Sequence, residues 1–196
     1  INLTTDGGNT WKIISEKLPQ NLWVSRVVFS KHSKNRIYIS LNGYRYDDFN
    51  TYIFMTDDNG LSWKSIDGNM PLSPVNVIKE DPFYENLIYV GTDNGAYMSF
   101  NKGVRWEPFV SGLNKVAVHD IVIQSEKKDI LLGTHGRSIY KTSLLDIYNY
   151  LDNISKSKDG IVYMIEDMNY CQRCGTKRNN WDSYVDSKLK FTCLLY

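Results

Sequence analysis

Apolar and polar residues alternate along three segments of the chain, residues 26–40, 75–92 and 119–134. Each segment begins with an alternating apolar stretch, passes through a polar turn, and ends in a second stretch rich in β-branched and aromatic residues. A period of two, bounded by Asn, Asp, Gly and Pro, is typical of β-strands and hairpins. Because no stretch before about residue 143 has a helical period, the pattern predicts an all-β fold.

A short motif, Ser/Thr-x-Asp-x-Gly-x-Ser/Thr-Trp, recurs between these segments. It occupies residues 4–11 and 56–63, and residues 99–106 hold a degenerate third copy. Its tryptophans are 52 and then 43 residues apart. One four-stranded blade of a β-propeller takes roughly 40–50 residues, so the repeat predicts a propeller.

The composition of the motif fits a hairpin turn between two strands of one blade. Its Asp can accept hydrogen bonds from nearby backbone N–H groups, and its Gly allows a positive φ. Its Trp supplies a large apolar area that we expect to be buried between blades. The residues expected in these structural roles are Asp6, Gly8, Trp11, Asp58, Gly60, Trp63, Asn101, Gly103 and Trp106. The third turn is expected to be held less tightly, because Arg105 replaces the hydroxyl residue.

These motifs resemble the Asp-box, or BNR, repeats of sialidases, family 74 xyloglucanases and Vps10/sortilin-type propellers. The strings DPFYENLIYVGTDNGAYMS and GTHGRSIY are most similar to bacterial sortilin-like BNR-repeat proteins, often labelled glycosyl hydrolases. The resemblance covers about residues 1–145. It implies a β-propeller in which the box is a structural turn away from any catalytic residues, and a secreted, periplasmic or cell-surface location.

The repeat divides the chain into blades of about residues 22–67, 73–110 and 117–145, preceded by a box and one outer strand in residues 1–20. Residues 160–166 are β-prone and are a candidate to complete the last blade. Closed propellers typically have four to eight blades. We therefore expect about three to four four-stranded blades from the C-terminal part of a larger ring in residues 1–145, with blade closure plus a linker or tail in residues 146–196.

The longest departure from the repeat is the insertion at residues 42–51, NGYRYDDFNT. It carries the candidate ligand-binding residues Tyr44, Arg45, Tyr46, Asp47 and Asp48. Aromatic rings that stack and charges that orient a ligand are typical of sugar and peptide sites, and loops on a rigid scaffold often carry function. The alternative is a long hairpin whose aromatic residues pack on the neighbouring blade.

A second candidate lies at residues 133–138, GTHGRS, where His135 and Arg137 flank a glycine. Arg137 can bind a carboxylate with two hydrogen bonds, as sialidases do with three arginines, although the full sialidase set cannot be assembled from this sequence. The alternative is that both side chains bond backbone carbonyls of the last blade. His119 and Asp120 begin a strand, and His119 can pair with His135.

The composition narrows the classes of partner and cofactor that we expect. The formal net charge is +1, which gives no reason to expect nucleic acid or an anionic membrane as a partner, and no run is long and apolar enough to span a bilayer. No loop has calcium-site spacing, and Cys171, Cys174 and Cys193 do not supply the four ligands of structural zinc. We expect no cofactor and no metal.

Two functions stay open from the sequence. One is a binding or scaffold propeller that presents loops to a glycan, a peptide or a protein. The other is a glycoside hydrolase whose catalytic acids lie in blades outside this chain. The acids Asp6, Asp58, Asp81 and Glu85 all fall in turns, where the repeat accounts for them.

Overall fold

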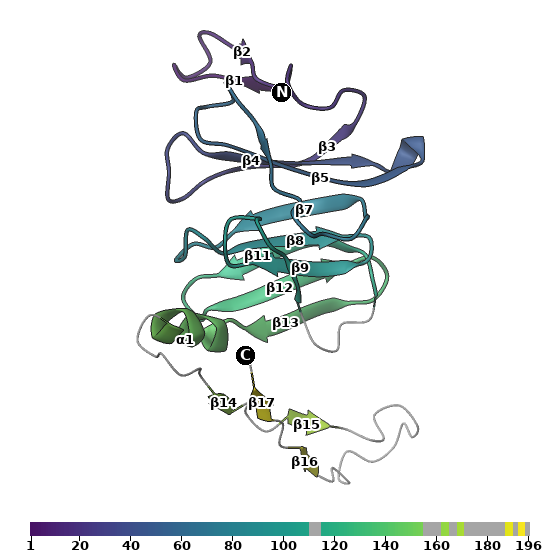
Figure 1. Ribbon diagram of the computed structural model, residues 1–196, viewed down its shortest axis with the longest axis vertical. Coiled ribbons are helices and arrows are strands. Elements are labelled where there is room, and N and C mark those ends of the chain that lie inside the picture. The colour runs from purple at the N-terminus through teal and green to yellow at the C-terminus, as the bar shows by residue number, and fades with distance from the viewer. Residues whose placement is uncertain (110–114, 155–161, 165–167, 171–186, 190–191, 195–196) are drawn as a thin grey trace. The chain divides into compact units, whose positions relative to one another are not determined.

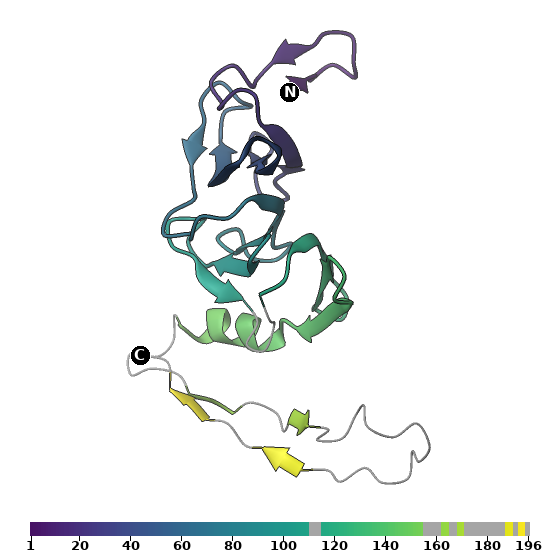
Figure 2. The same cartoon turned by 90° about the vertical axis from the view of Figure 1, so that its right-hand side faces the viewer.

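The computed structural model describes residues 1–109, 115–154, 162–164, 168–170, 187–189 and 192–194. Chain contacts divide the protein into two compact units, Ile1–Ser143 and Leu144–Tyr196. The first unit holds consecutive antiparallel sheets that follow one another in chain order (Figures 1 and 2). It carries the Asp boxes and both candidate loops.

Two of these sheets are complete four-stranded blades. Blade II consists of β3 (Trp23–Phe29), β4 (Ile37–Gly43), β5 (Asp48–Thr56) and β6 (Lys64–Ser65). Blade III consists of β7 (Val75–Glu80), β8 (Ile88–Thr92), β9 (Gly95–Ser99) and β10 (Glu107–Phe109). In each blade every strand pairs with the next along the chain, which confirms the predicted four-stranded repeat.

Partial blades flank these two. Blade I is represented by its outer hairpin, β1 (Asn2–Leu3) and β2 (Lys12–Ile13). Blade IV is represented by β11 (Val118–Gln124), β12 (Asp129–Thr134) and β13 (Ile139–Ser143). The described residues therefore form a segment of a propeller ring, as the repeat predicts.

The hydrophobic core lies between adjacent blades. Between blades I and II, Ile14 and Leu18 pack with Ile37, Ile39 and Leu41 of β4. Between blades II and III a larger cluster joins β4 and β5 to β7 and β8; it comprises Tyr38, Ile53, Met55, Ile66, Val75, Ile78, Ile88, Val90 and Trp106. Both faces of the middle strands are covered, so β8 is buried along its whole length.

The strand order gives the blades two distinct ends. One end, the box face, holds the β3–β4 and β7–β8 turns and the Asp boxes. The opposite end, the hairpin face, holds the β4–β5, β8–β9 and β12–β13 turns. Both candidate loops lie on the hairpin face, at opposite ends of the strands from the boxes.

The first two boxes have the same hydrogen bonds, as the sequence predicts. Asp58 accepts bonds from the Ser62 amide (2.9 Å) and hydroxyl (2.6 Å), and Asp6 accepts the same pair from Thr10 at 2.9 and 2.6 Å. These hydrogen bonds from Thr10, together with one from Thr4, lower the pKa of Asp6 to about 2. Each box glycine has a positive φ; the values are 98°, 84° and 83° at Gly8, Gly60 and Gly103.

The third box keeps the fold with fewer bonds. Asn101 accepts the Arg105 amide at 2.8 Å, and Ser99 closes the other side of the turn. The Arg105 guanidinium bonds Glu107 instead of the box residue. The hydroxyl bond present in the other two copies is therefore replaced, in line with the expected looser turn.

The box tryptophans follow the expected burial in part. Trp106 is 2% exposed and Trp63 is half-buried, and both indoles bond the preceding blade. Trp11 corrects the expectation, because it is 62% exposed. The reason is positional: the blade that would take its indole would precede blade I, and no described sheet occupies that place.

Each inner strand carries a bulge at the same position. The register shifts between Val24 and Arg26 in β3, and at the equivalent points of β7 and β11. The extra residues are Ser25, Asn76 and His119. A bulge re-aims the side chain of its extra residue, so the blades present these three residues in equivalent settings near the hairpin face.

The second unit begins with α1 (Leu145–Ile154). Its other described elements are β14 (Val162–Met164), β15 (Met168–Tyr170), β16 (Ser187–Leu189) and β17 (Thr192–Leu194). β14 pairs with β17, and β15 pairs with β16. Residues 160–166 were expected to complete blade IV, but their strand β14 pairs with β17 instead. Cys171 and Cys174 lie outside the described residues, and no described helix meets the length and hydropathy needed to cross a membrane.

Candidate functional site

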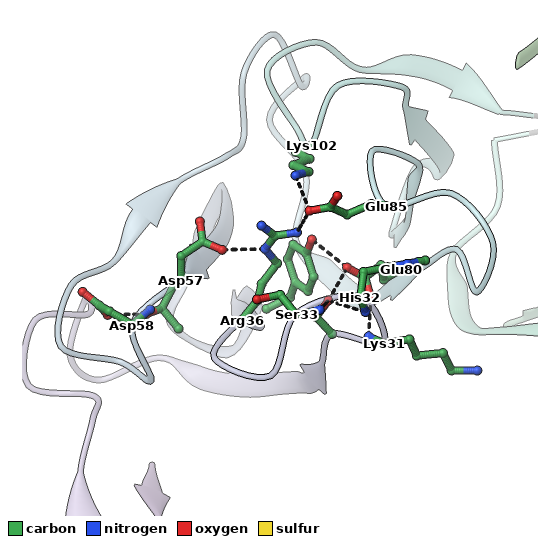
Figure 3. Close-up of polar contacts among 12 residues, drawn as sticks. Lys31, His32, Ser33, Arg36, Asp57, Asp58, Glu80, Glu85 and Lys102 are labelled. Carbon is green, nitrogen blue, oxygen red and sulfur yellow. Dashed lines mark hydrogen bonds and ion pairs between the residues drawn. The ribbon is translucent and has the colours of Figure 1, made fainter.

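Charged residues on the box face join blade II to blade III (Figure 3). Arg36, only 8% exposed, donates from Nε to Asp57 and from a terminal nitrogen to Glu85, both at 2.6 Å. Lys102 also reaches Glu85 at 2.6 Å. Hydrogen bonds from Lys102 and Arg36 lower the pKa of Glu85 to about 2. Burial opposes the charge of Arg36, but its two carboxylate partners outweigh burial and raise its pKa.

Glu80 is a second charged residue between these two blades, and it is only 2% exposed. It accepts hydrogen bonds from the Ser30 hydroxyl (2.8 Å), the Lys31 amide (2.7 Å) and the Tyr38 hydroxyl (3.0 Å). Burial, reinforced by the Glu80 charge, raises the pKa of Tyr38. All three donors belong to blade II, whereas Glu80 ends β7 of blade III, so this carboxylate fastens the two blades together.

The sequence analysis did not single out Glu80. A signal was available, because Glu80 stands at an inward position of the alternating strand VNVIKE. An acid in a buried register needs partners to offset its desolvation. Glu80 and Glu85 bond across to blade II and Asp57 bonds Arg36 within it, so all three carboxylates have structural partners.

The hairpin face carries an exposed group of aromatic residues and one cation, which we name the hairpin cluster: Trp23, Tyr44, Arg45, Tyr46 and Phe49. Tyr44 and Tyr46 are 58% and 62% exposed. The Arg45 guanidinium lies 4.6 Å from the centre of the Trp23 ring, a cation–π distance. Tyr44 and Phe49 meet edge to face at 5.9 Å. These two contacts position the Trp23, Tyr44 and Phe49 rings, and all four aromatic side chains stay about half exposed to solvent.

Local geometry fixes this hairpin. Tyr44–Tyr46 form a 3₁₀ turn that ends at Asp47, whose φ is 56°. The Asn42 side chain accepts the Tyr44 amide at 2.9 Å. Gly43 is needed for close approach, because a Cβ there would lie 2.7 Å from the Asp48 Cβ. The turn is held from both sides, which gives its aromatic residues a defined platform.

Asp47 and Asp48 shape the hairpin. Asp48 accepts bonds from the Asn50 amide (3.0 Å) and the Tyr52 hydroxyl (2.8 Å). Hydrogen bonding from Asn50 and then Tyr52 lowers the pKa of Asp48. Both of its oxygens are occupied within the hairpin. In the structure Asp48 braces the hairpin, while the Asp47 side chain is exposed to solvent like those of Tyr44, Arg45 and Tyr46.

The second candidate loop joins β12 to β13. His135 donates its amide to the Ala117 carbonyl at 2.9 Å, and Thr134 donates its hydroxyl to the Ser138 carbonyl at 2.6 Å. The His135 and Arg137 side chains are exposed. The His135 ring lies 5.5 Å from that of His119, so the pairing anticipated from the sequence is present.

The two candidate loops share the hairpin face but belong to blades II and IV, with the β8–β9 turn of blade III between their positions in the ring. Hydrogen-bonded polar side chains connect blade II to blade III on this face. Asn42 donates to the Asn76 side chain at 3.0 Å, and Asn76 donates to Asp93 at 2.8 Å. Trp23, Asn76 and Asp93 were not predicted as part of the face. Trp23 had a usable signal, since it is a tryptophan outside any Asp box.

The innermost strands β3, β7 and β11 border a groove of about 370 Å³. Arg26 of β3 and Asp120 of β11 form an ion pair at 2.8 Å across it. Val27 and Val122 line the groove and are 39% and 51% exposed. In a closed propeller such inner strands surround the central channel.

A family model agrees with this architecture. The model for Sortilin-Vps10, described as sortilin, neurotensin receptor 3, matches residues 1–172. The chain belongs to the sortilin/Vps10 family. No curated protein sequence matches the chain significantly.

Solved structures with the same fold include two GH74 enzymes. An ancestral GH74 enzyme superposes with a TM-score of 0.57 at 18% identity, and a GH74 enzyme from Niastella koreensis with 0.58 at 15%. These matches cover 72% and 74% of the sortilin-family chain but only 21% and 24% of the enzymes. A structure of YCF48 bound to D1 peptide gives a TM-score of 0.50 at 19% identity, covering 72% of this chain and 43% of YCF48. At these identities the likeness establishes the propeller fold.

Proposed function

We propose that the chain forms part of a ligand-binding propeller whose hairpin face recognises a glycan or a peptide. The observation that carries the proposal is the hairpin cluster, an exposed set of aromatic rings and one arginine on a fixed hairpin. Tyr and Trp supply large contact area at a low cost in conformational entropy. Arg45, positioned over Trp23 at 4.6 Å, adds a cation in a defined place.

The position of the cluster supports recognition. Its hairpin projects from the opposite end of the blades from the boxes, so a ligand can bind without disturbing the hydrogen bonds that hold the turns. His135 and Arg137 extend the proposed binding face to blade IV, where Arg137 is available to a carboxylate. The rest of the propeller ring would complete this face. The YCF48 structure provides a propeller of the same fold with a bound peptide.

Membership of a glycoside hydrolase propeller is the second candidate, and the two GH74 enzymes with this fold favour it. The acids Asp48, Glu80, Glu85 and Asp120 are each engaged by protein partners. In this alternative the two catalytic carboxylates of a glycosidase would come from other blades. The hairpin cluster would then form part of a substrate-binding face.

The experiment compares glycan-array and peptide-library binding by the full chain with that of the triple variant Trp23→Ala, Tyr44→Ala and Tyr46→Ala. The matched control is Phe83→Ala, which removes an aromatic ring 47% exposed on the box face. We expect a ligand bound by the wild type and by the control and lost in the triple variant. Binding that survives in the triple variant would refute the hairpin face as the site, and glycan turnover would support the hydrolase alternative.

Secretion or surface display is part of the proposal and rests on the family resemblance. Cell fractionation with an antibody against the chain tests it. Recovery of the intact gene product in the cytosol alone would contradict it.

A further inference from the structure

Blades III and IV present a pair of side chains at equivalent positions on the hairpin face. Asn76 and His119 are the extra residues of equivalent bulges in β7 and β11. Asp93 and His135 each follow the last residue of the adjacent strand, β8 or β12. Their amides make the same backbone bond, to Pro74 in blade III and to Ala117 in blade IV. The backbone therefore brings each pair together in the same way.

The two blades use this position differently. In blade III the Asn76 amide donates to the Asp93 carboxylate at 2.8 Å, so the pair satisfies itself. In blade IV two imidazoles lie side by side, with ring centres 5.5 Å apart and planes tilted by 47°. Both histidines are exposed, and the described part of the chain offers no hydrogen-bond partner to their ring nitrogens. Neutral imidazoles in this state have nitrogen lone pairs available to a ligand.

The ring separation suits one metal ion held between two imidazoles. With a Zn–N bond of about 2.1 Å, and a ring centre about 1 Å behind the nitrogen, two rings of a tetrahedral site have centres about 5 Å apart. The observed 5.5 Å reaches that value with a small side-chain adjustment. We propose that His119 and His135 form a binding site for a divalent transition-metal ion such as Zn²⁺, Ni²⁺ or Cu²⁺.

The site has two protein ligands. Among the described residues, no cluster of three or more His, Cys, Asp or Glu is placed to hold a metal, and the carboxylate of neighbouring Asp120 bonds Arg26. Water or an external ligand fills the remaining coordination positions. Imidazole suits Zn²⁺, Ni²⁺ and Cu²⁺, whereas Mg²⁺ and Ca²⁺ prefer oxygen ligands. The expected order of affinity is Cu²⁺ above Ni²⁺ and Zn²⁺, with no binding of Mg²⁺.

The experiment is isothermal titration of the full chain with Zn²⁺ and with Ni²⁺. Cys171, Cys174 and Cys193 are changed to Ser throughout, so that thiols do not contribute. We expect one ion per chain, with affinity reduced at least about tenfold by His119→Gln or His135→Gln, since each removes one of two protein ligands. Long-range ¹H–¹⁵N spectra should show both imidazoles shifting on titration.

Two further variants make the test decisive. The double variant His119→Asn with His135→Asp copies the pair of blade III, so it should fold, as unfolding curves would verify, and lose the site. His32→Gln is the matched control, because the chain has three histidines and His32 already contacts the Asp81 carbonyl at 2.8 Å. Absence of binding to the parent chain, binding that survives in the folded double variant, or equal weakening by His32→Gln would each overturn the proposal.

Discussion

The indole nitrogen of Trp106 donates a hydrogen bond of 2.8 Å to the backbone carbonyl of Ile66 in the preceding blade. Trp63 makes the same bond, at 2.7 Å, to Ile14. In both cases the acceptor stands three residues after the Trp of the previous box. The box therefore does more than close a turn, because its Trp also connects one blade to the blade before it.

Replacing Trp106 with Ala should destabilise the protein strongly, by about 3–5 kcal/mol, because it removes a buried ring and leaves the Ile66 carbonyl without this partner. Trp11→Ala is the matched variant, since Trp11 is 62% exposed and its loss should change stability by less than about 0.5 kcal/mol. Chemical denaturation measures both. Equal losses in the two variants would contradict the connecting role.

Glu80→Ala should cost about 1–3 kcal/mol, because it leaves the buried Tyr38 hydroxyl and two partly buried donors of blade II without this acceptor. Glu107→Ala is the control, because Glu107 makes an exposed pair with Arg105 and such pairs contribute little. Urea unfolding curves of the two variants give the comparison. A Glu80 variant as stable as the control would show that the contact does not fasten the blades.

Alanine substitutions at two glycines of the Asp boxes separate the cost of backbone strain from the cost of overpacking. Gly60→Ala places a Cβ 2.6 Å from the Ile14 Cβ, whereas Gly7→Ala meets nothing within 4 Å; φ is positive at both, 84° and 72°. Gly7→Ala should therefore cost about 1–2 kcal/mol for its conformation alone. Gly60→Ala should cost a further 1–3 kcal/mol, roughly, for overpacking. Thermal and urea unfolding measure the stability of both variants. Equal losses of stability would contradict the close packing of blades I and II at Gly60.

Acid should loosen the box face. Hydrogen bonds lower the pKa of Asp6 and Glu85 from 3.8 and 4.5 to about 2, and those from Ser62 lower the pKa of Asp58. A carboxyl group whose pKa is lower in the folded state stabilises the fold above its unfolded pKa and loses that effect as pH falls through the folded value. The free energy of unfolding should thus decline between about pH 4 and pH 2.

Asp58→Asn tests the origin of that decline. The variant copies Asn101 of the third box: its side-chain oxygen can accept the Ser62 amide but lacks the second carboxylate oxygen that takes the Ser62 hydroxyl. It should be less stable than the wild type at neutral pH and lose less stability on acidification. An unchanged slope between pH 4 and pH 2 would mean that other groups dominate the acid response.

Much of the fold was readable from the sequence because a propeller repeats one local plan. Alternation with a period of two specified β3–β4, β7–β8 and β11–β12, and the spacing of the boxes specified one blade per repeat. Asp58 and Gly60 were predictable in role, since a turn is stabilised by residues close in the chain.

Contacts between blades were decided by the tertiary structure. Trp11 and Trp63 belong to the same motif, yet one is exposed and the other contacts Ile14, because burial depends on whether a preceding blade is present. Glu80 bonds donors 42 to 50 residues away. Local pattern carries no information on such distant pairs, which exist only once two sheets pack.

The candidate binding site on the hairpin face was likewise predictable only in part. The insertion at residues 42–51 was visible in the sequence as a break in the repeat, and its aromatic composition identified it as a candidate. Only the folded chain places Trp23 under Arg45, and it sets the distance and tilt of the His119–His135 pair that the sequence anticipated. Both contacts depend on which strands become neighbours, and the histidine pair also depends on the bulge in β11. The sequence therefore determines the blades, while packing and register determine the groups of side chains that a ligand would meet.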